Sequence, residues 1–115
     1  MKFINGFTMK SVMAKIRKYN SGKKSLVKTP GGGSLCAYQA KDNNRCLIGC
    51  FIPSGHKALS FEGTVDDLLV VHPDLHEFMP LPFNGLEKFQ LVHDNLPRRT
   101  RSVHKAAEAW LKRNI

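Results

Sequence analysis

The sequence contains no apolar run long enough to cross a membrane. The richest run, Leu68–Val71, ends at His72 and Pro73, whereas a membrane-spanning helix needs about 18 uninterrupted apolar residues. Residues 1–6 also lack the apolar stretch that a secretory signal peptide carries. These absences predict a soluble protein without a membrane partner.

Cysteine is scarce, and its count is odd. The three residues are Cys36, Cys46 and Cys50. An odd number cannot pair completely within the chain, and this count favours a reducing compartment over the disulfide framework of a small secreted domain. We therefore expect a cytoplasmic protein.

The chain is also short, with 115 residues. A domain of this size buries roughly two thirds of the surface of its unfolded chain, which supports one core and excludes a two-domain enzyme. We expect a single domain over residues 1–115. No motif of the sequence calls for a cofactor, and none is expected.

Negative charge is in short supply and is concentrated in the middle of the chain. The formal net charge is +9. Residues 1–60 carry 11 basic side chains against one acidic, residues 61–97 carry one against seven, and residues 98–115 carry six against one. A positive excess of this size predicts an anionic partner.

Apolar spacing and capping residues predict four helices. They are expected over residues 9–19 after Thr8, from Val65 up to Pro73, through residues 86–96 before Pro97, and from Ser102 towards the C-terminus. Thr64 with Asp67, and Asn84 with Glu87, have the spacing of capping boxes. A buried strand is the alternative for the second segment.

The strands are expected in the first half of the chain. Two apolar runs, residues 35–40 and 46–52, flank the turn formers Asp42–Asn44 and predict an antiparallel hairpin. Residues 25–29 predict a shorter strand, followed by a flexible glycine loop at residues 30–33. The expected fold class is α+β: a small antiparallel sheet built on the hairpin at about residues 35–52, with about four helices packed on one face. Its expected core is Phe7, Val12, Ile16, Leu35, Ile48, Leu68, Phe89, Val92, Trp110 and Leu111.

Cys46 and Cys50, with His72 and His76, have the count and type of ligands that zinc takes in structural sites. If residues 46–52 form a strand, however, residues four apart lie about 13 Å from each other, and only a bend at Gly49 would bring the two cysteines to one ion. The ligands of one metal ion must lie far closer together. The sequence therefore predicts no metal site, and it predicts that these cysteines are buried apolar side chains.

Catalytic cysteine chemistry is not expected either. Cys36 would lie within a strand, away from any helix N-terminus that could lower the pKa of its thiol. His93 and Asp94 are adjacent, and neighbours on a helix point about 100° apart. We expect them to be a surface pair and expect no catalytic residues.

Arginine is concentrated just before the last predicted helix, where Arg98, Arg99 and Arg101 precede Lys105. The planar guanidinium group makes bidentate contacts to phosphates or carboxylates. The sequence therefore predicts an anion-binding or nucleic-acid-binding site here. If the fold brings the two ends of the chain together, a second group of basic residues extends it: Lys15, Lys18, Lys23 and Lys24.

The segment Cys46–Pro53 resembles a family of small uncharacterised proteins of tailed phages and bacteria. Cys36, Tyr38, Glu62–Gly63 and the later Leu91–Asp94 contribute to the resemblance. The resemblance implies a phage or bacterial origin, and therefore the host cytoplasm if the gene belongs to a phage. It implies no established activity.

The positive charge, the absence of an expected catalytic cysteine and the resemblance together predict a non-enzymatic accessory protein of phage type. Its basic surface is expected to bind nucleic acid or a host nucleoprotein complex. Two alternatives stay open: a protein inhibitor that presents the acidic middle of the chain to a host defence enzyme, and a small cysteine or metal-dependent enzyme. The oligomeric state is not predicted.

Overall fold

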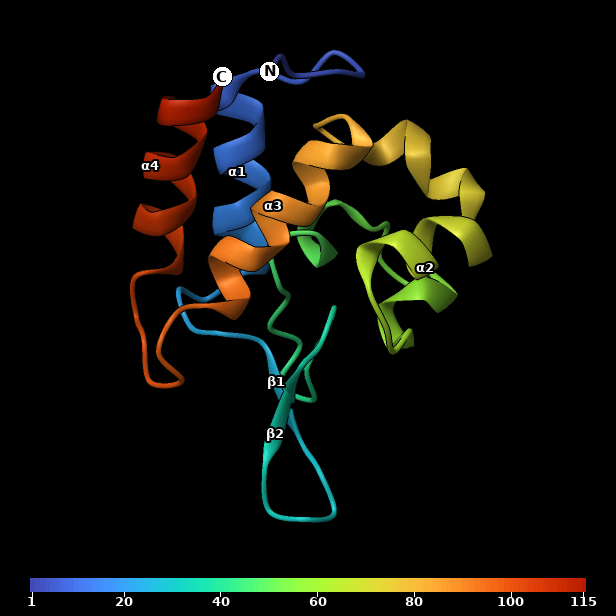
Figure 1. Cartoon of the computed structure of the whole chain (residues 1–115), viewed down its shortest axis with the longest axis vertical. Helices are drawn as coiled ribbons and strands as arrows, with labels where there is room; N and C mark the ends of the chain where they lie inside the picture. The colour runs from blue at the N-terminus through green and yellow to red at the C-terminus, as the bar shows by residue number, and fades with distance from the viewer.

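The computed structural model describes residues 1–115 and has the α+β architecture that the sequence predicts. Four α-helices surround an irregular central segment, and a two-stranded hairpin extends from one end (Figure 1). None of the helices has the length and hydropathy needed to cross a bilayer. In chain order the elements are α1 (Met9–Tyr19), β1 (Leu26–Lys28), β2 (Ser34–Cys36), η1 (Gly49–Phe51), η2 (Lys57–Ser60), α2 (Val65–Val71), η3 (Pro73–Phe78), α3 (Phe83–Asp94) and α4 (Val103–Asn114).

The first helix begins and ends where its sequence predicts. The hydroxyl of Thr8 accepts a hydrogen bond from the backbone N–H of Ser11, and the Ser11 hydroxyl accepts one from the Thr8 N–H. This reciprocal pairing satisfies two of the free donors at a helix N-terminus. Val12, Met13 and Ile16 form the buried face of α1.

The structure contains an antiparallel hairpin, but it pairs other segments than the predicted ones. The antiparallel pair joins Leu26–Lys28 to Ser34–Cys36 across the glycine loop, with Val27 opposite Leu35. Gly32 has a positive φ of 83°, which glycine adopts without strain. The predicted pairing of residues 35–40 with 46–52 is reduced to a single bridge between Gln39 and Arg45.

The segment predicted as the second hairpin strand folds into a helical turn instead. The Cys50 N–H donates to the Cys46 carbonyl at 3.1 Å, and η1 follows directly. Every residue from Cys46 to Ile52 is buried. A run that is apolar at every position does not distinguish a strand from a buried helical segment, since the alternation of a half-buried strand is missing. Here the tight turn places all seven residues in the core.

The second helix confirms its predicted start and excludes the alternative of a strand. The Thr64 hydroxyl accepts from the Asp67 N–H, and α2 ends before Pro73. The later caps differ from prediction. Helix α3 begins at Phe83 after Pro82, without the expected capping box, and the Ser102 side chain makes no capping hydrogen bond to α4.

The helices pack chiefly on one another rather than on one face of a sheet. Close contacts join α1 to α4, α3 to α4, α2 to α3 and α1 to η1. Of the predicted core, Phe7, Val92 and Trp110 are only partly buried, while Leu35 is 57% exposed and lies outside the core. Leu35 is exposed because it belongs to the projecting hairpin, not to a central strand. The other predicted core residues are buried: Val12, Ile16, Ile48, Leu68, Phe89 and Leu111.

Candidate functional site

The beginning of α4 packs directly on the end of α1. The Val103 N–H donates to the carbonyl of Gly22 at 3.1 Å, and the His104 ring nitrogen Nε2 lies 2.7 Å from the carbonyl oxygen of Asn20. Gly22 has a φ of 93°, and a Cβ atom there would lie only 3.0 Å from the Arg101 carbonyl oxygen. The fold therefore holds residues 20–23 against residues 101–104, and the two ends of the chain lie together (Figure 1).

This packing brings the basic segment at the end of α1 beside the basic segment at the start of α4. Arg17 and Lys112 pair with Glu108 at 3.3 and 3.2 Å. The Lys112 ammonium, and to a smaller extent Arg17, hold the pKa of the Glu108 carboxyl below its usual value. The remaining basic residues here are exposed and form no ion pair; we call them the basic face: Lys18, Lys23, Arg99, Arg101 and Lys105.

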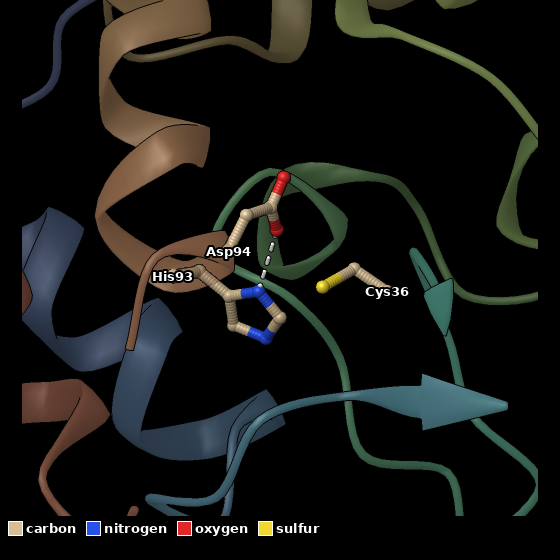
Figure 2. A group of neighbouring side chains, drawn as sticks. All are labelled: Cys36, His93 and Asp94. Atoms are coloured by element: carbon tan, nitrogen blue, oxygen red, sulfur yellow. Dashed lines mark hydrogen bonds and ion pairs between the residues drawn. The ribbon is translucent and has the colours of Figure 1, made fainter. Parts of the chain in front are cut away.

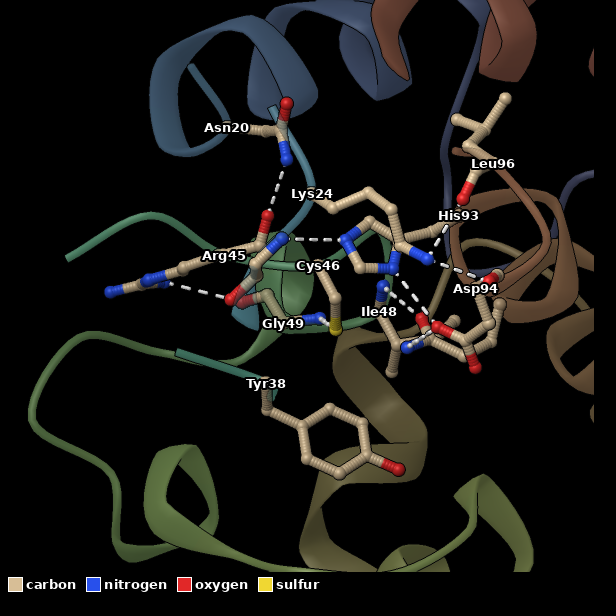
Figure 3. Close-up of polar contacts among 12 residues, drawn as sticks. Asn20, Lys24, Tyr38, Arg45, Cys46, Ile48, Gly49, His93, Asp94 and Leu96 are labelled. Carbon is tan, nitrogen blue, oxygen red and sulfur yellow. Dashed lines mark hydrogen bonds and ion pairs between the residues drawn. The ribbon is translucent and has the colours of Figure 1, made fainter. Parts of the chain in front are cut away.

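Three of the predicted binding residues lie elsewhere or have another contact. Lys24 is partly buried, and its ammonium group donates to the carbonyls of Asp94 at 2.7 Å and Leu96 at 2.9 Å (Figure 3). Arg98 donates to the hydroxyl of Ser34 in the hairpin. Lys15 is exposed and lines a different hollow, together with Tyr19 and Phe78.

A shallow polar hollow of about 280 Å³ adjoins the basic face at the end of α1. Its lining combines ammonium and guanidinium groups, which can donate to an anion, with side-chain amides. The amide nitrogens of Asn20 and Asn44 already donate to backbone carbonyls. One carboxylate, that of Asp42, also lines it. The basic lining residues are Arg17, Lys18 and Lys23, and the amide residues are Asn20, Asn43 and Asn44.

A second cluster, which the sequence pattern did not predict, contains Cys36, His93 and Asp94 (Figure 2). The pair of His93 and Asp94 was expected at the surface, but the His93 ring is fully buried. The backbone N–H of Ser25 donates to His93 Nε2 at 2.9 Å. Because a backbone N–H can only donate, the ring proton lies on Nδ1, which donates to Asp94 Oδ1 at 2.9 Å.

This geometry does not activate the Cys36 thiol. Its sulfur points towards the His93–Asp94 pair in Figure 2, but both ring nitrogens of His93 are already in use. Burial, and secondarily the negative charge of Asp94, raise the pKa of the Cys36 thiol to about 11. At neutral pH the thiol is therefore protonated, and a thiolate is the form that reacts as a nucleophile.

The cluster borders a cavity of about 270 Å³ between the end of β2, the start of α2 and one side of α3. Two carboxylates, those of Glu87 and Asp94, line it together with the amide of Gln90. Tyr38 also lines the cavity, and its hydroxyl donates to the Gly63 carbonyl at 3.0 Å. We call this cavity the acidic pocket.

A third titratable cluster fastens η2 to η3. His56 Nε2 lies 2.7 Å from Asp74 Oδ2, while His56 Nδ1 accepts from the Ala58 N–H at 2.9 Å. The hydrogen bond from His56 holds the pKa of the Asp74 carboxyl below its usual value. The His72 ring packs edge-on against that of His56, with centroids 5.3 Å apart. Since both nitrogens of His56 are bonded within the protein, this cluster has a structural explanation.

The cysteine and histidine pairs considered as zinc ligands do not converge. Cys46 and Cys50 are buried on one helical turn, so the strand geometry used to argue against a shared ion was wrong. Burial raises the pKa of both thiols, that of Cys46 to about 12. His72 lies instead with His56 and Asp74.

Comparison with models of protein families, with curated proteins and with solved structures finds no match. The resemblance of Cys46–Pro53 to small phage and bacterial proteins therefore stays a prediction. Part of this segment has a structural explanation in the chain itself. A Cβ atom at Gly49 would overlap the carbonyl oxygen of Tyr38, so the close approach of these two backbones requires glycine.

Proposed function

We propose that this chain is a non-enzymatic accessory protein of phage type, cytoplasmic in its host, that binds nucleic acid through its basic face. The nucleic acid is bound alone or within a host nucleoprotein complex. The observation that carries the proposal is the packing of residues 101–104 on residues 20–23. It brings together cationic side chains that are about 80 positions apart in the sequence, as a phosphate-binding surface needs.

The chemistry of the basic face suits phosphates. Arg99 and Arg101 are both exposed and are separated by Thr100, and each guanidinium group can make two parallel hydrogen bonds to a phosphate. Lys18, Lys23 and Lys105 add ammonium groups that internal ion pairs do not neutralise. Each phosphate contact releases condensed counterions, which makes binding favourable at low salt.

Two features support a binding role over cysteine catalysis. The pKa of each of the three thiols is raised, chiefly by burial. The histidine nearest to a cysteine, His93, has both ring nitrogens engaged. A nucleophilic cysteine needs the opposite: a lowered pKa and a neighbouring base that can take the proton.

The test measures binding of a short fluorescent DNA duplex, and of its single strand, over a series of salt concentrations. The triple variant Arg99→Ala, Arg101→Ala, Lys105→Ala removes three charges from the basic face. We expect weaker binding than for the parent, and a slope of log K against log salt that is smaller by about two to three. The melting temperature should stay nearly unchanged because all three side chains are exposed.

The matched control removes three exposed lysines away from the basic face: Lys2, Lys57 and Lys88. Its net charge equals that of the first variant, so equal losses from both would show that only total charge matters and would contradict the proposal. Absence of binding by the parent at low salt would also contradict it. The role of an inhibitor that acts through its acidic segment would then be the better hypothesis.

A further inference from the structure

The acidic pocket is a cavity that the proposed function does not use. Its carboxylates come from one side of α3, and its opposite wall is the end of β2 with residues 63–65. The chain as a whole carries a net charge of +9. Glu62 and Asp67 add further negative charge near this cavity. A ligand that enters it meets acceptors of hydrogen bonds and negative charge.

The carboxylate of Asp94 is held in a fixed orientation. His93 Nδ1 donates to its Oδ1 at 2.9 Å, and the amide nitrogen of Gln90 donates to the same oxygen at 3.4 Å. Gln90 is itself oriented, because its side-chain oxygen accepts from the Ile48 N–H at 3.2 Å. Both nitrogen donors bond to Oδ1, and Oδ2 has no N–H donor from the protein.

This arrangement favours a cationic donor over a metal ion. A metal bound to His93 Nδ1 would place the ring proton on Nε2, where it would face the N–H of Ser25 and lose that buried hydrogen bond. A guanidinium group needs no such change. It can donate to Oδ2 of Asp94 while the protein keeps its own hydrogen bonds, and Glu87 supplies a second carboxylate on the wall of the pocket.

A larger hollow of about 500 Å³ adjoins the acidic pocket and shares three lining residues with it: Cys36, Ala37 and Gly63. Its walls include the apolar side chains of Val27, Leu35 and Phe61. The 57% exposure of Leu35 leaves apolar surface open beside a charged pocket. The two cavities therefore suit a ligand that carries a cation next to an apolar group.

We infer that the acidic pocket binds the guanidinium group of an arginine in an extended segment of a partner protein, and that the adjoining hollow takes an apolar neighbour of that arginine. Arginine fits better than lysine because its planar fork can donate to two acceptors at once. The guanidinium group is expected to belong to a peptide, because a free guanidinium compound would leave the apolar hollow empty. This inference does not depend on nucleic-acid binding, because no residue of the basic face lines the acidic pocket.

The probe is the capped tripeptide acetyl-Leu-Arg-Leu-amide, followed by backbone NMR shifts of the isotope-labelled full-length protein. We expect saturable shifts at Gln90, Leu91 and Asp94. The same peptide with citrulline, which is neutral and of the same shape, should bind at least tenfold more weakly. N-acetyl-arginine amide should bind more weakly than the tripeptide if the hollow contributes.

Asp94→Asn should weaken binding of the tripeptide at least tenfold, and Glu87→Gln should weaken it as well. Glu87 is exposed and makes no hydrogen bond through its side chain, so this second variant tests the pocket without disturbing His93. Asp66→Asn is the matched control, since it removes one exposed carboxylate of α2 that does not line the pocket.

Equal binding of the arginine and citrulline peptides would overturn the inference, as would shifts confined to other parts of the chain or an equal effect of Asp66→Asn. If N-acetyl-arginine amide binds as tightly as the tripeptide, the partner segment is ruled out as the source. If Glu87→Gln loses affinity for the peptide but binds DNA as the parent does, peptide binding and nucleic-acid binding are independent of one another.

Discussion

At the scale of single residues, backbone groups determine what several side chains can do. The N–H of Ser25 sets the tautomer of His93, and that tautomer in turn orients Asp94. The same kind of constraint acts at Gly49, where the carbonyl of Tyr38 occupies the space of a side chain. Such effects depend on contacts between segments that lie far apart in the sequence.

Gly49→Ala should therefore destabilise the protein. The added methyl group would overlap backbone rather than a flexible side chain, so relief requires a shift of the Tyr38 segment or of η1. We expect a loss of about 1–3 kcal/mol in the free energy of unfolding, the usual range for an overpacked core, as measured by urea denaturation.

Gly31→Ala is the control for this substitution. Gly31 has open space around its Cα and no positive φ. The free energy of unfolding of this variant should therefore stay within about 0.5 kcal/mol of that of the parent. If the two variants were equally stable, the close approach of Gly49 to Tyr38 would be wrong.

At the scale of elements, side chains from distant segments satisfy the helix ends. The ammonium group of Lys24 donates to two carbonyls at the C-terminus of α3, where a cation also interacts favourably with the helix dipole. Lys24 was predicted as a residue that binds anions. Its contacts give it the role of a C-terminal cap, while its exposed neighbour Lys23 stays available for a ligand.

Lys24→Met should lower the free energy of unfolding by about 1.5–3 kcal/mol, because methionine keeps an apolar stem but loses charged hydrogen bonds to the two carbonyls. Lys23→Met is the matched control, with the same change of charge at an exposed position. Thermal and urea denaturation should show a loss for the first variant only. Equal stability of the two variants would argue against the cap.

At the scale of the whole molecule, the excess of positive charge makes the folded state sensitive to acid. The carboxyls of Asp74 and Glu108 have folded pKa values below their ordinary values of 3.8 and 4.5. Their stabilising effect is fully present above those ordinary values and is lost as the pH falls through the lower, folded ones. Protonation of carboxylates also raises the positive charge of the molecule and its self-repulsion.

We therefore expect the melting temperature to fall as the pH drops below about 4.5, the ordinary pKa of a glutamate carboxyl. Glu108→Gln should lower the melting temperature at neutral pH and make its decline in acid less steep, as followed by circular dichroism. Glu62→Gln serves as the control, since Glu62 forms no ion pair. An unchanged pH profile for Glu108→Gln would contradict the role of this ion pair.

Features that depend on neighbours in the sequence were predictable from the sequence alone. The bounds of α1 follow from apolar spacing after Thr8, and the start of α2 follows from the box of Thr64 and Asp67. The same holds for the α+β class. In each of these cases the determining interactions lie within a few residues, so the local sequence contains them.

Only the tertiary structure decided the pairing of the strands, the turn at Cys46–Ile52 and the burial of His93. A run of apolar residues records that a segment is buried but not its backbone conformation, because every face of it is covered. The partner of His93 comes from Ser25, and the acidic pocket needs three segments to meet. Contacts between distant segments form when the whole chain packs, and a single sequence does not specify which segments meet.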